Sequence, residues 1–416
     1  MQSLLILGRQ PAIGLAELES LYGAAKVKPI GNEAALVDVD PCLLAFDRLG
    51  GSIKFCKLLT ELETVDLAGI EHFLINTAPK QSLNMPKGKM LLGLSAYGFN
   101  TTAKQLLKTA VNIKQAVRTT GRGVRVVPNK ETALSSAQII HNRLLTPNGW
   151  DLVLVKDGQR TLIAQTIKVQ DIEAYARRDQ NRPYRDAKVG MLPPKLAQTI
   201  INLSVGLLPE EAAQSVCDIP PDQPIPKQHY QNTLILDPFC GSGVILQEAA
   251  IMGYDVMGTD IDQRMVDYAA KNIDWLKSLK STPVNSEVSI DTKLADATSY
   301  NWERTPTNIA TETYLGKPLP SLPQPKDLEP VMAECNQIIN DFLTNLAKQI
   351  NTGARICMAV PAWQQKNKSF IHLPVLDSIG VIGYNRVSFE HVRDDQLIYY
   401  RPGQVVAREL LVLTRK

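Results

Sequence analysis

A glycine-rich turn between an apolar strand and a helix is the feature of this 416-residue chain that indicates chemistry most clearly. Residues 234–237 form an apolar run that ends in an acid, Gly241 and Gly243 follow, and residues 244–250 have a helical pattern. Glycines at such a turn let the backbone approach a bound nucleoside closely. A phosphate-binding P-loop would need Lys followed by Ser or Thr after its last glycine, where this chain has Val244. We therefore expect a nucleoside, and not a phosphate group, at this turn.

Two later strand ends carry carboxylates that suit the same ligand. Asp260 follows the apolar run 254–258 and stands 19 positions beyond Gly241, where an acid accepts hydrogen bonds from ribose hydroxyls. Asp296 ends a third run, where an adenine amino group would need an acceptor. Each acid alone could be an ordinary helix cap, but the ordered series predicts a nucleoside pocket. The residues expected to bind the cofactor are Asp237, Pro238, Phe239, Cys240, Gly241, Ser242, Gly243, Asp260, Ile261, Asp296 and Ala297.

Residues 237–243, Asp-Pro-Phe-Cys-Gly-Ser-Gly, resemble the first motif of class I methyltransferases that modify exocyclic amino groups of nucleic-acid bases. The resemblance implies S-adenosylmethionine as the cofactor. In those enzymes, Asp or Asn, two prolines and an aromatic residue follow the fourth strand. The Asp or Asn side-chain oxygen and a carbonyl positioned by proline accept hydrogen bonds from the target amine, and the aromatic ring stacks on the base. Residues 310–316 take that place here, without either proline. The resemblance then implies that Glu312 is the acceptor and that Tyr314 stacks on the base.

Charge is unevenly distributed along the chain. The net charge is only +3, but no Asp or Glu occurs from His72 to Lys130, where ten Lys or Arg residues lie. This favours a polyanion such as nucleic acid over a basic face that is merely solvated. A helix over 102–119 would align Lys104 with Lys108, and Lys114 with Arg118. The residues expected to bind RNA are Lys104, Lys108, Lys114, Arg118, Arg122, Arg177, Arg178, Arg182 and Arg185.

The arginines between residues 177 and 185 leave two interpretations open. They extend the basic surface toward the nucleoside pocket, or they belong to an interdomain connector and pair with Asp179 and Asp186. The surrounding segment, 175–197, and the opening segment, 5–21, resemble tRNA guanine-N2 methyltransferases, whose eukaryotic member modifies guanosine 10. Residues 59–168 resemble an RNA-binding THUMP domain. In that family the THUMP region grips the tRNA acceptor end, and the end of the connector, Pro-Pro-Lys-Leu-Ala, lies beside the cofactor.

Length and patterning predict an α/β protein with two or three domains. We expect a ferredoxin-like α+β domain over 1–58, a THUMP domain over 59–168, a connector over 169–195 and a Rossmann-like class I methyltransferase domain over 196–416. The last should contain a seven-stranded sheet with a terminal antiparallel pair. The proline-rich stretches 219–227 and 318–330 would be surface insertions or lids.

Composition narrows the functional classes. The six cysteines show no spacing typical of disulfides or zinc sites, so no metal is expected. The N-terminus has no basic leader and no apolar run long enough to span a membrane, which predicts a cytoplasmic protein without a membrane partner.

The predicted function is S-adenosylmethionine-dependent methylation of the N2 amine of a guanine in tRNA. The alternatives are an enzyme acting on ribosomal RNA or on another exocyclic amine, and an RNA-binding protein that retains a cofactor pocket. A small activating protein subunit, as in the eukaryotic relative, is an additional partner to test.

Overall fold

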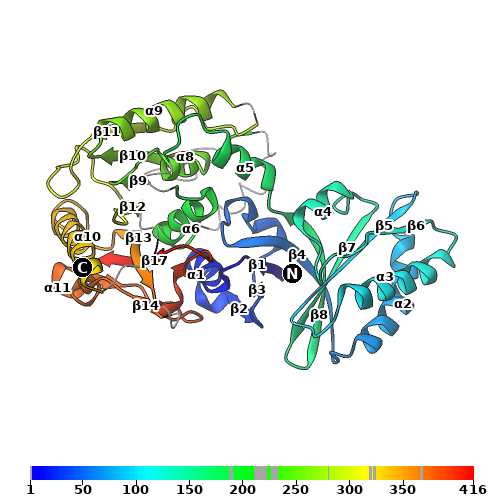
Figure 1. Ribbon diagram of the computed structural model, residues 1–416. Helices are drawn as coiled ribbons and strands as arrows, with labels where there is room; N and C mark the ends of the chain where they lie inside the picture. Colours follow the sequence, from blue (N-terminus) through cyan, green and yellow to red (C-terminus); the bar gives the residue numbers. More distant parts are fainter. Residues whose placement is uncertain are drawn as a thin grey trace. The chain divides into compact units, whose positions relative to one another are not determined.

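The computed structural model is a mixed α/β protein whose contacts divide it into two compact units (Figure 1). The first unit contains Met1–Pro11, Ala25–Asp47 and Ser52–Ile172, and the second contains Ala12–Ala24, Arg48–Gly51 and Glu173–Lys416. The predicted α/β class is confirmed, whereas the predicted four-part division remains a prediction. The structure describes residues 2–186, 191–209, 223–225, 233–279, 281–317, 321, 325–365 and 369–416. Cys217, Lys188 and most of the two predicted proline-rich insertions lie outside the described residues.

The first unit is built on an eight-stranded sheet in the order β2-β3-β1-β4-β8-β7-β5-β6. Its strands are β1 (Ser3–Leu7), β2 (Val27–Ile30), β3 (Ala34–Val37), β4 (Ser52–Leu62), β5 (Met90–Tyr97), β6 (Val124–Val126), β7 (Gly149–Asp157) and β8 (Arg160–Val169). Its helices are α2 (Leu67–Leu83), α3 (Ala103–Arg118) and α4 (Ser136–His141). β4 pairs with β1 on one side and with β8 on the other, so it joins the N-terminal strands to the rest of the sheet.

Helix α3 shows how local sequence sets the exposed basic face. Its N-cap, Thr102, accepts a hydrogen bond from the Gln105 backbone, and the Gln105 side chain accepts one from the Thr102 backbone, which is a capping box. Leu106, Ala110, Ile113 and Val117 are buried at helical spacing against the sheet. Lys104, Lys108 and Arg118 therefore lie on the exposed side, and Lys114 is half-buried.

The second unit has a nine-stranded sheet whose main path is β11-β10-β9-β12-β13-β17-β15. Its strands are β9 (Leu234–Asp237), β10 (Asp255–Asp260), β11 (Ile290–Leu294), β12 (Asn308–Glu312), β13 (Arg355–Gln364), β14 (Phe370–Ile371), β15 (Tyr384–Arg386), β16 (Ile398–Tyr399) and β17 (Val406–Arg415). The predicted seven strands are the main path. The sequence did not reveal β14 and β16, because strands of two residues carry no periodic pattern.

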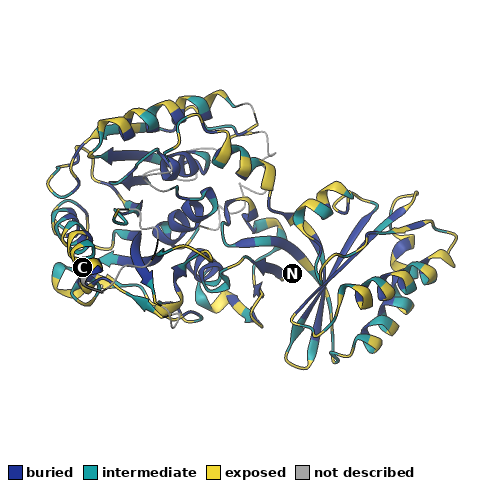
Figure 2. Ribbon diagram, in the orientation of Figure 1, coloured by how far each residue is buried: buried dark blue, intermediate teal, exposed yellow. Residues whose placement is uncertain are grey.

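Strand direction places a switch point in the middle of this sheet. β11, β10, β9, β12 and β13 are parallel, and β17 and β15 are antiparallel additions. The chain runs outward from β9 to β11 and then returns to the other side of β9 with β12. In open α/β sheets, ligands bind at the carboxyl ends of the strands at such a point. Figure 2 shows the strands of this sheet mostly buried. Among the described residues, no helix is long and apolar enough to cross a membrane.

The helices of the second unit include one that comes from near the N-terminus. They are α1 (Pro11–Tyr22, from Ala12 onward), α5 (Ile172–Gln180, from Glu173 onward), α6 (Pro194–Val205), α8 (Val244–Ile251), α9 (Gln263–Ser278), α10 (Pro325–Leu346) and α11 (Ile379–Ile382). Ile13 and Ala16 of α1 belong to the same hydrophobic cluster as α6, α8 and the central strands. The segment that the resemblance assigns to the opening of the protein thus contributes a helix to the pocket-bearing unit.

Glu17 is a fully buried carboxylate that fastens α1 to this unit. It accepts hydrogen bonds from the backbone N–H groups of Gly50 and Gly51, at 3.0 and 2.8 Å, and from the Asn202 side chain at 2.8 Å. Burial raises the pKa of Glu17, and these three donors oppose that rise. Asn202 in turn accepts a hydrogen bond from Arg48 Nε at 2.9 Å.

We expect Glu17→Ala to lower the free energy of unfolding of the full chain by about 3 kcal/mol, because it leaves buried N–H donors without acceptors. Glu329→Ala, a change at an exposed carboxylate on α10, is the matched control and should have almost no effect. Urea denaturation followed by circular dichroism measures both variants. An equal, small effect of the two substitutions would contradict the structural role of Glu17.

Local patterns in the sequence predict a helix that begins at Pro41 and another over 132–144, and both predictions were wrong in their extent. The first is only a 3-10 turn, Pro41–Leu43, and the second shortens to Ser136–His141. The sequence also gave no clear signal for α2, because Pro79 interrupts its helical pattern.

Candidate functional site

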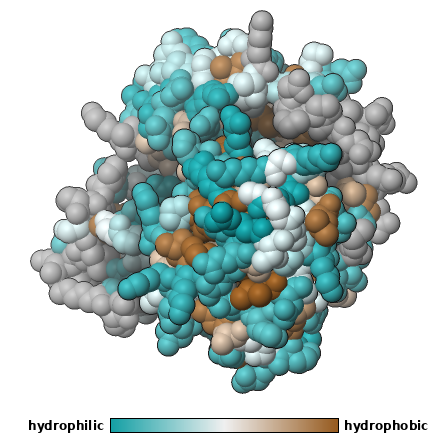
Figure 3. Space-filling model, turned by 90° about the vertical axis from the view of Figure 1, so that its right-hand side faces the viewer, coloured by the Kyte–Doolittle hydropathy of each residue, from teal (hydrophilic) through white to brown (hydrophobic). Residues whose placement is uncertain are grey.

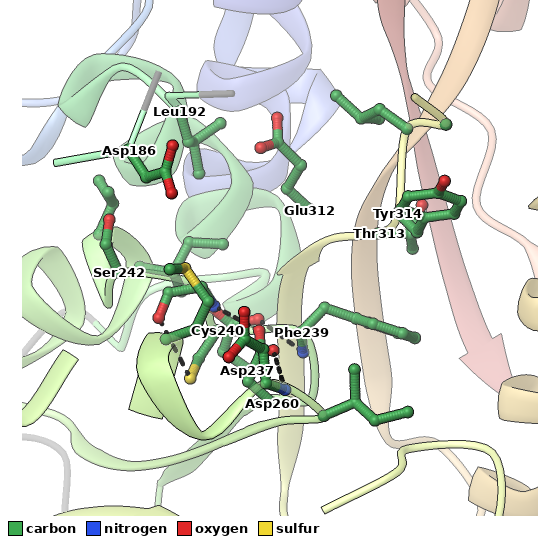
Figure 4. Close-up of a pocket in the computed structure, with 18 of the residues that line it drawn as sticks. Asp186, Leu192, Asp237, Phe239, Cys240, Ser242, Asp260, Glu312, Thr313 and Tyr314 are labelled. Atoms are coloured by element: carbon green, nitrogen blue, oxygen red, sulfur yellow. Dashed lines mark hydrogen bonds between the residues drawn. The ribbon is translucent and has the colours of Figure 1, made fainter. Parts of the chain in front are cut away.

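A pocket of about 330 Å³ lies in the second unit, at the carboxyl ends of β9, β10 and β12 (Figure 4). It is therefore at the switch point of the sheet. The structure brings nine of the predicted cofactor-binding and catalytic residues to its wall: Asp237, Phe239, Cys240, Gly241, Ser242, Asp260, Ile261, Glu312 and Tyr314. Asp186 and Leu192 also line it, from the segment that the sequence analysis interpreted as a connector.

The turn after β9 requires glycine at both predicted positions. Gly241 and Gly243 have φ angles of +50° and +83°, in the left-handed region. A Cβ atom on Gly243 would lie 3.1 Å from the Cβ of Ala269, so α8 and α9 pack too closely for a side chain there. A Cβ on Gly241, in contrast, would meet nothing within 4 Å. Gly241 lines the pocket and leaves open space for a ligand beside its backbone.

Asp260 supports this turn from the end of β10. Its carboxylate accepts a hydrogen bond from the Gly241 backbone N–H at 2.9 Å and another from the Asp262 backbone N–H at 2.9 Å. Each carboxylate oxygen has a second lone pair, so Asp260 retains acceptor capacity toward the pocket. Burial raises its pKa, and the N–H donors oppose this. The neighbouring Ile261 is 71% exposed, which leaves an apolar surface at the pocket wall.

Asp237 is the most perturbed acid of the pocket. Its side chain is buried and accepts a hydrogen bond from the Thr311 hydroxyl at 2.6 Å. Burial raises the pKa of Asp237 to about 8, the nearby carboxylates of Asp260 and Glu312 contribute to this, and the Thr311 hydrogen bond opposes it. Among the described residues that line the pocket, Lys317 is the only lysine or arginine. A bound cation would therefore be favoured here.

Glu312, the predicted acceptor, has a partner that the sequence did not indicate. Its Oε1 atom accepts a hydrogen bond from Arg408 Nε on β17, in an ion pair whose Glu312 and Arg408 side chains are 16% and 7% exposed. Figure 4 shows the side chains of Glu312 and Tyr314 extending in different directions, so the stacking role of Tyr314 stays a prediction. Thr313 stands where the related motif has its first proline, and both its N–H and its hydroxyl donate to the Ala359 carbonyl, at 3.0 and 3.2 Å.

Four predicted cofactor residues do not line this pocket: Pro238, Gly243, Asp296 and Ala297. Asp296 is exposed, and its Oδ1 accepts hydrogen bonds from the backbone N–H and the hydroxyl of Thr298, at 2.9 and 2.7 Å. Asp296 is thus a local cap for the backbone that follows it, which is the alternative that the sequence analysis gave for this acid. Asp186, by contrast, was assigned only to the connector, yet it lines the pocket and pairs with Arg264 at 3.0 Å.

The predicted RNA-binding residues differ in their access to solvent. Lys104, Lys108, Arg118 and Arg185 are exposed, and Lys114 and Arg177 are half-buried. Arg122 donates to the Ser82 carbonyl at 2.6 Å and to Asn148 Oδ1 at 2.7 Å, so it fastens loops of the first unit. Figure 3 shows a face that is hydrophilic over most of its area, with small separate hydrophobic patches.

Two arginines of the predicted RNA surface are buried, which corrects their assignment. Arg178 is 7% exposed and pairs with Glu248, whose Oε1 lies 2.6 Å from its Nε. Arg182 is 2% exposed, and burial lowers its pKa. Neither guanidinium is on a surface that a phosphate could reach. For Arg178 the structure therefore agrees with the second interpretation, an arginine of the connector that forms an ion pair. Its partner is Glu248 and not Asp179 or Asp186. Among the described residues, no group of three or more His, Cys, Asp or Glu side chains could hold a metal ion.

Comparison with known proteins supports the assignment of the pocket. A family model described as a DNA methylase matches residues 155–271. The tRNA (guanine(10)-N2)-dimethyltransferase of Methanothermobacter thermautotrophicus is 27% identical over 211 residues, which are 50% of this chain and 49% of that protein. The protein of the same name from Methanocaldococcus jannaschii is 27% identical over 114 residues, 27% of this chain and 25% of the relative. The chain resembles the tRNA guanine-N2 methyltransferases.

These matches confirm the resemblance that was predicted from the motifs, and they span at most about half the length of the two relatives. A solved structure, TrmN from Thermus thermophilus, aligns over 100% of both chains with a TM-score of 0.50 and 14% identity. At this identity the likeness is one of fold. The whole-chain match therefore supports the predicted α/β fold.

Proposed function

We propose that this chain transfers a methyl group from S-adenosylmethionine to the exocyclic N2 amine of a guanine in tRNA. The observation that carries the proposal is the pocket at the switch point, where Asp237, Asp260 and Glu312 meet beside the open backbone of Gly241. An acidic pocket with an accessible glycine backbone fits a nucleoside that carries a positive charge. The two relatives named as tRNA guanine-N2 dimethyltransferases favour this substrate over other bases.

Each pocket residue has a distinct part in this proposal. S-adenosylmethionine supplies a methyl group bonded to a positively charged sulfur. Asp260 accepts hydrogen bonds from ribose hydroxyls, Ile261 packs on the adenine, and Asp237 stabilises positive charge. Glu312 accepts a hydrogen bond from the guanine amine through Oε2, because Oε1 is already bound to Arg408. This turns the nitrogen lone pair out of conjugation with the ring.

The transfer step then conserves atoms and charge. The nitrogen lone pair forms the new N–C bond while the C–S bond breaks, and the electron pair of that bond stays on sulfur. The nitrogen loses one proton to water. A guanine paired in a stem must first leave the helix stack, and an aromatic wall stabilises the extruded base, which is the part proposed for Tyr314.

The first unit is proposed to bind the rest of the tRNA as a THUMP domain, in the cytoplasm. Support comes from the acid-free stretch His72–Lys130 and from α3, whose exposed lysines and arginine face solvent. A region that binds RNA by charge and shape recognises phosphates without reading bases. A small activating subunit is a partner that the resemblance implies, and its requirement is tested by adding it to the transfer assay.

Neutralising two lysines on α3 is expected to weaken tRNA binding and to reduce its salt dependence. The variant Lys104→Gln/Lys108→Gln should lower the salt slope of log K by about 1 to 2, since each lost phosphate contact removes about one unit. The control Lys277→Gln/Lys348→Gln makes the same charge change at exposed positions outside the acid-free stretch. Fluorescence anisotropy of labelled tRNA at several salt concentrations measures both. Equal slopes for the two variants would show that α3 is only a solvated basic face and does not bind tRNA phosphates.

The substrate class is tested by offering the purified chain labelled S-adenosylmethionine with four nucleic acids. These are unmodified tRNA transcripts, a ribosomal RNA fragment, duplex DNA and single-stranded DNA. The proposal predicts that label enters tRNA at the highest rate. Preferred labelling of DNA would instead follow the description of the matching family model. Cofactor binding without transfer to any of them would favour an RNA-binding protein that retains a cofactor pocket.

A further inference from the structure

Arg408 reaches the proposed acceptor from across the sheet. Strand register aligns Glu312 of β12 with Ala359 of β13, and Ala359 with Leu410 of β17. Arg408 is two residues from Leu410 and opposite Pro361, so its side chain is on the same face as Glu312 and beyond the end of β12. It must extend over β13 to place Nε on Glu312 Oε1. The next residue, Glu409, points to the other face and contacts His372 and Arg386.

The ion pair lies among other acidic groups. Asp237 on β9 and Asp260 on β10 line the same pocket as Glu312, and both side chains of the pair are largely buried. The other titratable groups that line the pocket are Asp186, Asp262, Cys240, Tyr314 and Lys317. β13 contributes Ala359 and Pro361 on this side, neither of which titrates. Arg408 is thus the cation in direct contact with Glu312 among the described residues.

Glutamate also needs more restraint than the aspartate or asparagine it replaces. Its side chain has one more rotatable bond, and the two prolines that would stiffen the backbone after it are absent. Thr313 fixes that backbone through two hydrogen bonds to Ala359, but it does not fix the carboxylate. The contact with Arg408 Nε removes this remaining freedom at Oε1 and leaves Oε2 unassigned.

We propose that Arg408 is a positioning residue for methyl transfer: it holds Glu312 through Oε1 so that Oε2 accepts from the target amine. The inference rests on the proposed function, because it assigns Arg408 a task in that reaction. It explains how a motif without prolines remains competent. It also explains why a buried arginine on β17, a strand that does not line the pocket, is paired with a residue of the pocket wall.

The test compares Arg408→Met and Arg408→Lys in the full chain with the wild type. Without the guanidinium, the Glu312 carboxylate is no longer held at Oε1, so Arg408→Met should lower kcat at least about tenfold. Arg408→Lys should recover part of the rate, while the KM for tRNA and the cofactor Kd stay within about threefold of wild type. Arg393→Met, at an exposed ion pair, is the matched control and should change nothing.

A purely structural role for Arg408 would give a different result. It would raise the KM for tRNA or the cofactor Kd together with the fall in kcat, and the lysine variant would recover nothing; either finding, or an unchanged kcat for Arg408→Met, overturns the proposal. The double variant Glu312→Gln/Arg408→Met leaves no unpaired charge and controls for folding. If Arg408 acts through Glu312, the double variant should be within about twofold of Glu312→Gln alone. Multiplicative losses would overturn the proposal.

The same experiment separates this inference from the proposed function. If the wild type transfers no methyl to guanine in tRNA, the proposed function fails, and the role of Arg408 fails with it. If the wild type is active and Arg408→Met keeps the kcat of the wild type, only the role of Arg408 fails. Thermal denaturation and cofactor binding, measured on every variant, identify any loss that comes from unfolding.

Discussion

Glu312→Ala is expected to reduce methyl transfer to tRNA by about 10²- to 10⁴-fold, the range typical for a group that assists proton transfer or orients a reacting amine. The side chain lies at the carboxyl end of β12 and lines the pocket together with Asp237 and Asp260. Without it, nothing turns the nitrogen lone pair toward the methyl group. Transfer of labelled methyl into tRNA transcripts measures the rate, and calorimetry measures cofactor affinity, which should remain near that of the wild type.

Two further variants separate chemistry from folding at this position. Glu312→Ala leaves the buried Arg408 without its partner, which destabilises the protein by itself. The double variant Glu312→Ala/Arg408→Met removes both charges and should be as inactive as Glu312→Ala. Glu312→Gln retains an amide oxygen as an acceptor and should be more active than either. Substantial turnover by Glu312→Ala would show that another group accepts from the amine.

The affinity for S-adenosylmethionine is expected to rise with pH up to about pH 8 and then to level off. The Asp237 carboxyl is buried beside Asp260 and Glu312, and its pKa is raised to about 8, so it is mostly protonated at neutral pH in the ligand-free protein. A cationic ligand binds better to the ionised form. Each pH unit below 8 should then weaken binding by up to about tenfold. S-adenosylhomocysteine lacks the sulfonium charge and should show a shallower dependence.

Asp237→Asn is the control for this pH dependence. It keeps the size of the side chain and should flatten the affinity profile, with the largest loss of affinity above pH 8. Calorimetric titrations at about five pH values would measure this. If the slope of affinity against pH were the same in the variant and the wild type, ionisation of Asp237 would not be the cause of the pH dependence.

The same raised pKa has a predictable effect on stability. An aspartate in the unfolded chain ionises near pH 4, whereas the folded Asp237 holds its proton to about pH 8. Between these values the folded state binds more protons than the unfolded state, so the free energy of unfolding of the ligand-free protein falls as the pH rises. Asp237→Asn should remove this contribution.

Local rules of conformation made part of this site predictable from sequence. The turn with Gly241 and Gly243 was predictable because left-handed φ angles and a strand-to-helix change leave a short pattern in the chain. Asp260 follows the same logic, since it ends the next parallel strand and its carboxylate reaches back to the Gly241 N–H. The order of these elements in the chain was therefore enough to predict a nucleoside pocket.

Contacts between distant segments could not be predicted in this way. Glu312 and Arg408 are 96 residues apart, and only the register of β12, β13 and β17 brings them together. Glu17 appears in the sequence as one more charge on a short helix, and one of its buried hydrogen-bond partners, Asn202, lies far along the chain. Asp296 is the opposite case, because its position in the chain suggested the pocket while its side chain accepts hydrogen bonds from Thr298.

Identification of the methylated nucleoside tests the central claim most directly. The wild-type chain is incubated with S-adenosylmethionine and an unmodified tRNA transcript, and the RNA is digested to nucleosides and analysed by mass spectrometry against standards. N2-methylguanosine or N2,N2-dimethylguanosine is the expected product, at a level at least about 100-fold lower in the reaction with Glu312→Ala. A methyl group on adenosine or cytidine, or no methylated nucleoside while the cofactor binds, would contradict it.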